Sequence, residues 1–117
     1  MSQTFPKASR LLKKSEFQRV YHKGTKLFGN QILIYASTNH QQTNRIGISV
    51  PKRFGKAHDR NYFKRLMRES FRTFNFSNKS YDFHVVPKRI ISEMEPKALK
   101  EEFSQLLEKL NLIEYHP

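Results

Sequence analysis

The residues from Arg60 to Arg72 combine cationic side chains and one amide in a spacing that suits phosphate binding. Arg60 and Asn61 are adjacent, and further Arg and Lys residues follow at helical spacing. Guanidinium groups form paired hydrogen bonds with phosphate oxygens, and an Asn amide suits 2′-hydroxyls or base edges because it both donates and accepts. The candidate polyanion-binding residues are Lys52, Arg53, Lys56, Arg60, Asn61, Lys64, Arg65, Arg68 and Arg72.

Several of these cations surround the predicted start of a helix near Ala57. The helix macrodipole repels positive charge at this end, so stability alone would not select the arrangement. The same end offers unpaired backbone N–H groups and a partial positive charge, both of which attract an anion. The pattern therefore indicates a phosphate site beside Arg60. A cationic helix face that contacts only solvent is the alternative.

The positive charge is concentrated in two short segments. Residues 7–26 contain seven Lys or Arg and one Glu, and residues 51–72 contain eight Lys or Arg and two acids. The other residues contain seven basic and seven acidic side chains, so the two segments account for the whole formal charge of +12. Such clustering is typical of a surface that binds a polyanion.

The first basic segment also contains aromatic residues at helical spacing. Phe17 and Tyr21 are one turn apart, and Tyr35 lies on a predicted strand near them. All three rings could belong to the core, but phenol groups need polar partners, so Tyr21 and Tyr35 suit the exposed edge of a cleft at least as well, and Phe17 suits either place. Rings between cations form a stacking platform for single-stranded nucleic acid. The flanking cations are Lys13, Lys14, Arg19 and Lys23.

Other catalytic chemistries lack the residues that they need. The sequence has no Cys, no glycine-rich phosphate loop, no HExxH and no GxSxG motif, and its His residues have no ligand spacing. A protein-only nuclease would need clustered carboxylates for two metal ions, yet Asp59 and Asp82 are the only Asp residues. We therefore expect no catalytic or metal-binding residue in this chain.

Periodicity predicts the elements that position these groups. A first helix is expected over 15–24, with Ser15 as its cap and Gly24 at its end. Strands are expected within 24–28, 29–37, 45–52 and 81–88, and further helices over 57–74 and 95–112. The order is αβββαβα, and its strand, long helix and strand predict a parallel βαβ unit in a mixed sheet. The fold class is α+β, in one domain of residues 1–117.

The two later helices have clear apolar stripes, which we expect to form the core. The inward residues are Phe63, Leu66, Met67, Ser70, Phe71 and Phe74 on the first of them, and Leu99, Phe103, Leu106, Leu107 and Leu110 on the second.

No stretch approaches the length of a membrane span, and the amino end lacks the apolar run of a secretion signal. A cytoplasmic protein without a membrane partner is expected.

The stretch VPKRFGKAHDRNYFKRLMRESFR, residues 50–72, resembles the signature of the bacterial ribonuclease P protein component. That signature is a V-x-K-x-x-G-x-A loop before an R-N-R-x-K-R-x-x-R-E-x-F helix. The matching residues are Val50, Lys52, Gly55, Ala57, Arg60, Asn61, Lys64, Arg65, Arg68, Glu69 and Phe71. Residues 10–24 are similar to the family's amino-terminal R-L-x-x-x-x-x-F-x-x-V-[FY]-x-x-G pattern, so the resemblance covers nearly the whole chain. Tyr62 departs from it, because the third triplet position is Arg in the family.

The resemblance implies a subunit of a ribonucleoprotein endonuclease that removes the 5′ leader of precursor tRNA. In that family the RNA subunit holds the catalytic Mg²⁺ and cuts the phosphodiester, so we expect the protein to bind no metal ion and to need no protein partner. The implied partners are ribonuclease P RNA, on the basic helix, and precursor tRNA, whose leader enters a central cleft. The implied leader-binding residues are Phe17, Tyr21, Tyr35, Lys13, Lys14 and Arg19.

The resemblance also implies a small two-layer sandwich with a left-handed βαβ crossover, in a fold class named after a ribosomal-protein domain. The RNA contact of the missing arginine is either lost at Tyr62 or supplied by a neighbour such as Arg65. A structural RNA-binding protein of ribosomal type, with no enzymatic role, is the alternative, because it would share every electrostatic feature. Only the combined motifs and the aromatic groove distinguish the two interpretations.

Overall fold

The computed structural model describes residues 7–11, 13–39, 41–76 and 79–115. The main elements are α1 (Lys14–Lys23), β1 (Thr25–Phe28), β2 (Ile32–Thr38), β3 (Arg45–Ile48), α2 (Ala57–Thr73), β4 (Tyr81–Pro87) and α3 (Pro96–Tyr115). Short 3₁₀ helices span Lys7–Ser9, Lys52–Phe54 and Ile91–Glu93. The predicted order αβββαβα is confirmed.

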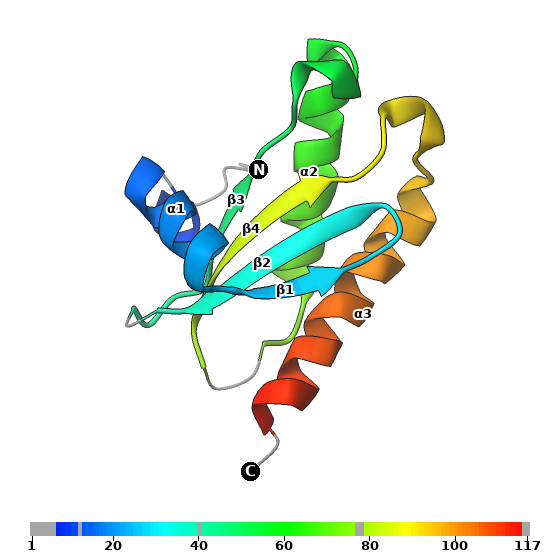
Figure 1. Ribbon diagram of the computed structural model, residues 1–117. Helices are drawn as coiled ribbons and strands as arrows, with labels where there is room; N and C mark the ends of the chain where they lie inside the picture. The colour runs from blue at the N-terminus through cyan, green and yellow to red at the C-terminus, as the bar shows by residue number, and fades with distance from the viewer. Residues whose placement is uncertain (1–6, 12, 40, 77–78, 116–117) are drawn as a thin grey trace, which may run out of the picture.

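The four strands form one mixed sheet in the order β1-β2-β4-β3. β2 pairs antiparallel with β1 and β4, whereas β3 and β4 are parallel because α2 returns the chain to the other end of the sheet. In Figure 1 both parallel strands rise, β4 lies to the right of β3, and α2 runs behind them. The crossover is therefore left-handed, as the resemblance implied and against the usual rule for βαβ units.

The main core lies between the sheet and the pair of helices α2 and α3. Alternate residues of β2 and β4 face this layer, among them Ile34 and Phe83, which are fully buried. The predicted inward residues of both helices are buried as well, apart from Phe74, which is partly buried. Within the described part of the chain, no helix is long and apolar enough to cross a membrane.

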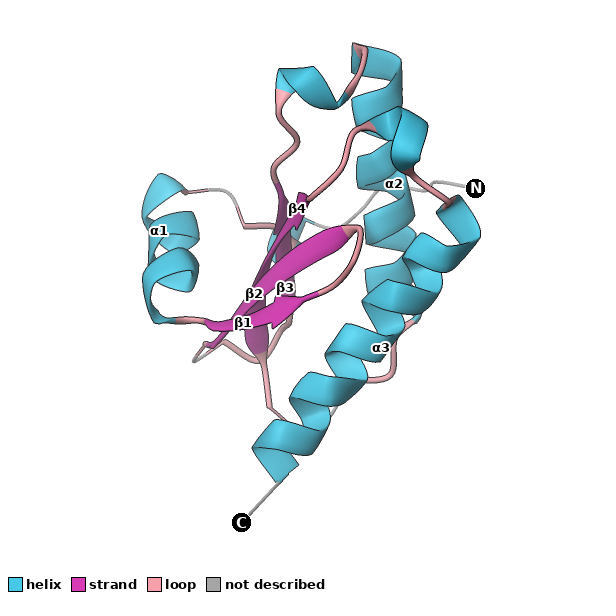
Figure 2. Cartoon of the chain, turned by 45° about the vertical axis from the view of Figure 1, so that its right-hand side comes forward, coloured by secondary structure: helices cyan, strands magenta, loops and turns pink. Residues whose placement is uncertain are grey.

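Helix α1 lies against the opposite face of the sheet (Figure 2). Here Leu11, Val20 and Tyr35 form a second, smaller cluster, with Phe17 among the partly buried residues around it. Gly47 of β3 leaves room for the Phe17 ring, because a Cβ at this position would collide with the ring. The sheet therefore carries a thick apolar layer on one face and a short helix on the other.

Two local predictions need correction. Ser15 is not the cap of α1, because Lys13 occupies the N-cap position and its backbone N–H donates to Glu16 Oε1 at 3.0 Å. The helix thus begins one residue earlier than expected. The third strand is also shorter than predicted, since β3 ends at Ile48 and the chain soon turns into the 3₁₀ helix before α2.

Candidate nucleic-acid interface

The cationic residues of α2 lie opposite its buried stripe. Asn61, Arg65 and Arg72 are exposed, and Lys64 and Arg68 are partly buried beside them. Because α2 packs against α3 and the sheet with its other side, these groups face away from the core. The cations that follow Arg60 at helical spacing therefore form one continuous face along the helix.

The start of α2 adds further cations to this face. Lys52 and Arg53 are exposed in the preceding 3₁₀ helix, and Lys56, also exposed, is the N-cap residue and makes no side-chain cap hydrogen bond. Arg60 Nη1 donates to the Gly55 carbonyl oxygen at 2.9 Å, which fixes its guanidinium against the loop. These four cations are thus gathered at the amino-terminal end of α2.

Arg10 extends the cationic face across the neighbouring strand, which the sequence did not predict. The segment before α1 runs beside β3, where Arg10 pairs with Ile46 in a parallel bridge. Burial, followed by repulsion from the positive charge of Arg10, lowers the pKa of Arg68. The sequence signals for Arg10 were its place in the basic segment 7–26 and at the start of the amino-terminal family pattern, and neither linked it to the α2 face.

Tyr62, which departs from the family pattern, supports a neighbouring cation. The Arg65 guanidinium carbon lies 5.2 Å from the centre of the Tyr62 ring, a cation–π distance. The same ring is partly buried and packs at the edge of the main core. The structure therefore places the Arg65 guanidinium against the ring that stands at the third triplet position.

An aromatic cluster covers the centre of the α1 face. The Tyr21 ring lies 5.1 Å from that of Tyr35, and Tyr35 stacks on His84 at 5.9 Å with 30° between the planes. Phe17 meets His84 edge-on at 4.9 Å. Lys26 Nζ lies 5.9 Å from the centres of both tyrosine rings, so a cation accompanies the cluster.

The structure decides between the two places open to the tyrosines, with Tyr21 at an exposed edge and Tyr35 in the core. Tyr21 is 49% exposed, whereas Tyr35 is only 8% exposed because its ring lies on the sheet beneath Tyr21 and beside His84. Burial, and then the neighbouring Tyr21 phenol, raises the pKa of Tyr35. Phe17 is partly buried and packs against the small core. Tyr35 is the floor of this cluster and Tyr21 its accessible surface.

Sequence reasoning missed two members of this cluster and one ring beside it. Lys26 pairs with Tyr35 across β1 and β2, and Tyr35 pairs with His84 across β2 and β4, so all three share one face of the sheet. Burial lowers the pKa of His84, which is therefore neutral at neutral pH. Phe28, two residues after Lys26 on the same face, is 65% exposed. The strand alternation alone could have placed Lys26 and Phe28 here.

The cations predicted for the leader cleft differ in their surroundings. Lys13 and Lys14 are exposed at the start of α1. Arg19, in contrast, donates from Nη2 to Asp82 Oδ2 at 2.5 Å. Within the residues described, no three His, Asp or Glu side chains gather in a way that could hold a metal ion.

Comparison with known proteins decides the family. The sequence model of the family Ribonuclease P matches residues 5–111. A ribonuclease P protein component from Caldanaerobacter subterraneus subsp. tengcongensis is 40% identical over 109 residues, which cover 92% of this chain and 94% of that protein. The chain belongs to the ribonuclease P protein family.

Other ribonuclease P proteins agree in sequence and in fold. The component from Chlamydia caviae is 37% identical over 105 residues, which cover 87% of this chain and 73% of that protein. The structure of the Staphylococcus aureus RNase P protein matches with a TM-score of 0.80 and 30% identity, over 89% of this chain and 96% of that one. The Thermotoga maritima protein matches with a TM-score of 0.74 and 27% identity, over 86% and 96%.

Membership confirms the family inferred from the two sequence motifs and the α+β fold that it implied. The chain is a ribonuclease P subunit, which favours the main interpretation over a structural protein of ribosomal type. In this ribonuclease P protein the basic signature forms the exposed face of α2, and the amino-terminal motif forms α1 and its contacts with the sheet.

Proposed function

We propose that this protein binds ribonuclease P RNA through α2 and the 5′ leader of precursor tRNA through the α1 face of the sheet. The observation that carries the proposal is the separation of the two basic segments. The segment 51–72 forms the outer side of α2, whereas most of the segment 7–26 lies with α1 on the other face of the sheet (Figure 2). Two separate surfaces suit two different RNA ligands.

The α2 face has the properties expected for a folded RNA. Its cationic groups are guanidinium and ammonium groups, and one amide accompanies them along a helix of 17 residues. Such groups contact phosphates and 2′-hydroxyls without needing an unpaired base. The residues that we assign to this contact are Lys52, Arg53, Lys56, Arg60, Asn61, Lys64, Arg65, Arg68 and Arg72, together with Arg10.

The α1 face has the properties expected for a single strand. Stacking on aromatic rings requires bases that are free of pairing, and the precursor's leader supplies them. Tyr21 presents an accessible ring here and packs on Tyr35. Tyr35 in turn stacks on His84, which Phe17 meets edge-on. Lys13, Lys14 and Lys26 supply the charge that a phosphate backbone needs near the rings.

Cleavage in this proposal belongs to the RNA subunit and its Mg²⁺ ions, and the protein contributes binding energy. The groups gathered on both protein surfaces are cations, an amide and rings, which suit phosphates and bases, whereas Mg²⁺ prefers carboxylate, phosphate and water oxygens. We place this assembly in the cytoplasm, with no membrane and no further protein partner required.

A reconstituted holoenzyme tests the division of labour. Lys64→Gln and Arg65→Gln should weaken assembly with the RNA subunit and leave the precursor-to-mature tRNA affinity ratio of the assembled enzyme unchanged. Tyr21→Ala should leave assembly unchanged and lower that ratio. Loss of assembly by Tyr21→Ala, or a changed ratio in the two α2 variants, would show that the two RNA ligands share one surface.

A further inference from the structure

We propose that Asp82 is a positioning residue for leader binding, because its buried carboxylate fixes α1 on the sheet and thereby sets the place of the Tyr21 ring. Arg19 acts through Asp82 and does not contact RNA. The proposal rests on the leader-binding role proposed for the α1 face. It changes the role of Arg19, which the sequence assigned to the leader itself.

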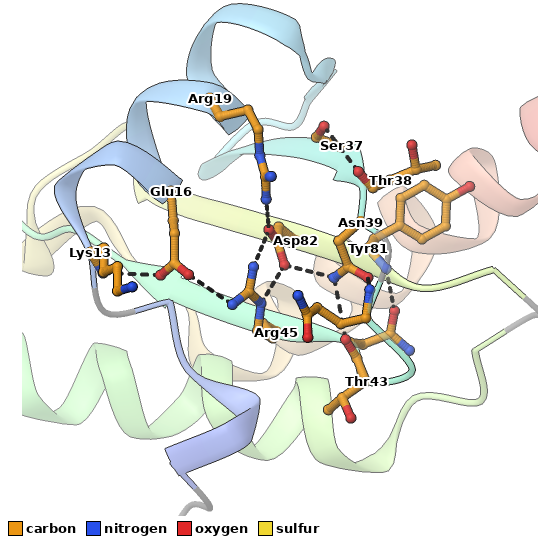
Figure 3. Close-up of polar contacts among 12 residues, drawn as sticks. Lys13, Glu16, Arg19, Ser37, Thr38, Asn39, Thr43, Arg45, Tyr81 and Asp82 are labelled. Carbon is orange, nitrogen blue, oxygen red and sulfur yellow. Dashed lines mark hydrogen bonds and ion pairs between the residues drawn. The ribbon is translucent and has the colours of Figure 1, made fainter.

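The Asp82 carboxylate is 0% exposed and joins three separate segments (Figure 3). Arg45 of β3 donates to both of its oxygens, each at 2.7 Å. Asn39, just after β2, donates to Oδ1 at 2.7 Å, and Arg19 of α1 donates to Oδ2. Buried charges are stable only when paired and hydrogen-bonded in this way. Asp82 thus ties α1 to the strands beneath it.

A second ion pair holds the same helix one turn earlier. Arg45 Nη1 lies 2.8 Å from Glu16 Oε2, so Arg45 bridges the carboxylates of Glu16 and Asp82. Glu16 and Arg19 are three residues apart and therefore lie on one side of α1. Two attachment points on one side fix both the position of the helix and its rotation about its axis.

Helix α1 depends on these contacts because little else holds it. It has ten residues, fewer than an isolated helix needs for stability in water, and Val20 is its only fully buried residue. Apolar packing tolerates small rotations, whereas charge-assisted hydrogen bonds are directional. The ion pairs therefore decide where the next turn places Tyr21 relative to Tyr35.

The charges of the network argue against a phosphate contact by Arg19. Two guanidinium groups, of Arg19 and Arg45, face two carboxylates, of Glu16 and Asp82. The network is neutral as a whole, and it adds nothing to the positive field of the α1 face. Lys14, in contrast, is an exposed cation of the same helix for which the structure shows no carboxylate partner among the described residues.

Salt titration of the reconstituted holoenzyme separates positioning from phosphate binding. With Arg19→Gln we expect the affinity for precursor tRNA to fall about tenfold as the Tyr21 stack is lost, while the affinity for mature tRNA and the salt slope stay at their wild-type values. The KM for the precursor should rise and kcat should stay unchanged. The matched control Lys14→Gln removes the same charge and should reduce the salt slope by about 0.7.

A double-mutant cycle with Asp82→Asn completes the test. If Arg19 acts through Asp82, the double variant should lose no more precursor affinity than Asp82→Asn alone. Where Asp82→Asn fails to fold, Arg19→Gln decides alone, because the Arg19 side chain is 43% exposed and its removal leaves the core intact. Three results would overturn the proposal: a reduced salt slope in Arg19→Gln, an unchanged precursor-to-mature ratio in that folded and assembled variant, or additive losses in the cycle.

Discussion

Replacing Tyr21 by Ala should remove the accessible part of the leader platform and little else. The Tyr21 ring is 49% exposed, and its described ring contacts are Tyr35 at 5.1 Å and His22 at 5.2 Å. Tyr35→Ala would be less informative, because Tyr35 is 8% exposed and its removal would also damage the small core. Tyr21 is therefore the residue at which binding and stability separate best.

The expected losses of leader affinity and of folding stability differ in size. Loss of one base stack lowers binding by about 1 to 3 kcal/mol, which is roughly a five- to 150-fold weaker affinity. Loss of the Tyr21–Tyr35 pair costs the fold about 0.5 to 1.5 kcal/mol, because nearly half of the ring is already in water. The variant should remain folded while precursor binding falls.

The assay compares the affinities of the assembled holoenzyme for precursor and mature tRNA. Mature tRNA has no leader, so Tyr21→Ala should weaken only precursor binding, and shortening the leader past the stacked base should abolish the difference between variant and wild type. Tyr21→Phe keeps the ring and should behave as wild type. Leu112→Ala removes an exposed side chain from α3, 71% exposed, and serves as a control that leaves the ratio unchanged. An unchanged ratio in folded, assembled Tyr21→Ala enzyme would refute the placement of the leader on this face.

Four further predictions concern the RNA contact, the chemistry and the fold. Tyr62→Ala should weaken binding of the RNA subunit about two- to fivefold by removing the platform beneath Arg65, whereas Tyr62→Phe should not, and equal effects of both would contradict the cation–π role. If about five cations neutralise phosphates, affinity for the RNA subunit should fall on the order of 10²-fold between about 50 and 200 mM salt, and a flat response in a filter-binding titration would contradict this. Protein freed of RNA should cleave no precursor tRNA, while the RNA subunit alone should cleave slowly at high Mg²⁺. Metal-dependent cleavage by the protein that disappears with Asp59→Ala would contradict the assignment of catalysis to the RNA subunit. Burial raises the pKa of Asp82, but hydrogen bonds from Arg45 and Asn39 outweigh this effect and hold the pKa below the usual Asp value. The ionised Asp82 therefore stabilises the fold fully above about pH 4, and this contribution to folding stability is lost as the pH falls through the lowered pKa. Urea unfolding of Asp82→Asn should therefore show a lower stability at pH 7 and a shallower decline in acid than the wild type, and equal acid slopes would contradict the role of this carboxylate.

Local patterns were sufficient for the elements and for the main cationic surface. The apolar stripe of α2 predicted which side packs, and its cations then had to lie on the opposite side, because a helix repeats every 3.6 residues whatever surrounds it. The long helix between β3 and β4 predicted their parallel pairing in the same way. The prediction of a left-handed crossover, in contrast, came from the family resemblance, since no local pattern specifies the handedness.

On the α1 face of the sheet, local sequence patterns did not predict which side chains come together or how exposed they are. The sequence left Tyr35 open between an exposed edge and the core, because its exposure depends on where α1 lies, which the strand's own residues do not specify. Lys26 and His84 joined the cluster through the strand register, which pairs residues far apart in sequence.

The sequence by itself determined the order of elements, the buried sides of α2 and α3, and the concentration of charge in two segments, because each follows from spacing within one stretch of chain. Only the tertiary structure decided that Arg19 meets a carboxylate 63 residues away and that Arg10 approaches Arg68. Composition counts every cation as free, whereas folding pairs some of them with buried acids. Which cations remain available for RNA is set by the three-dimensional arrangement of the sheet and the helices on its two faces.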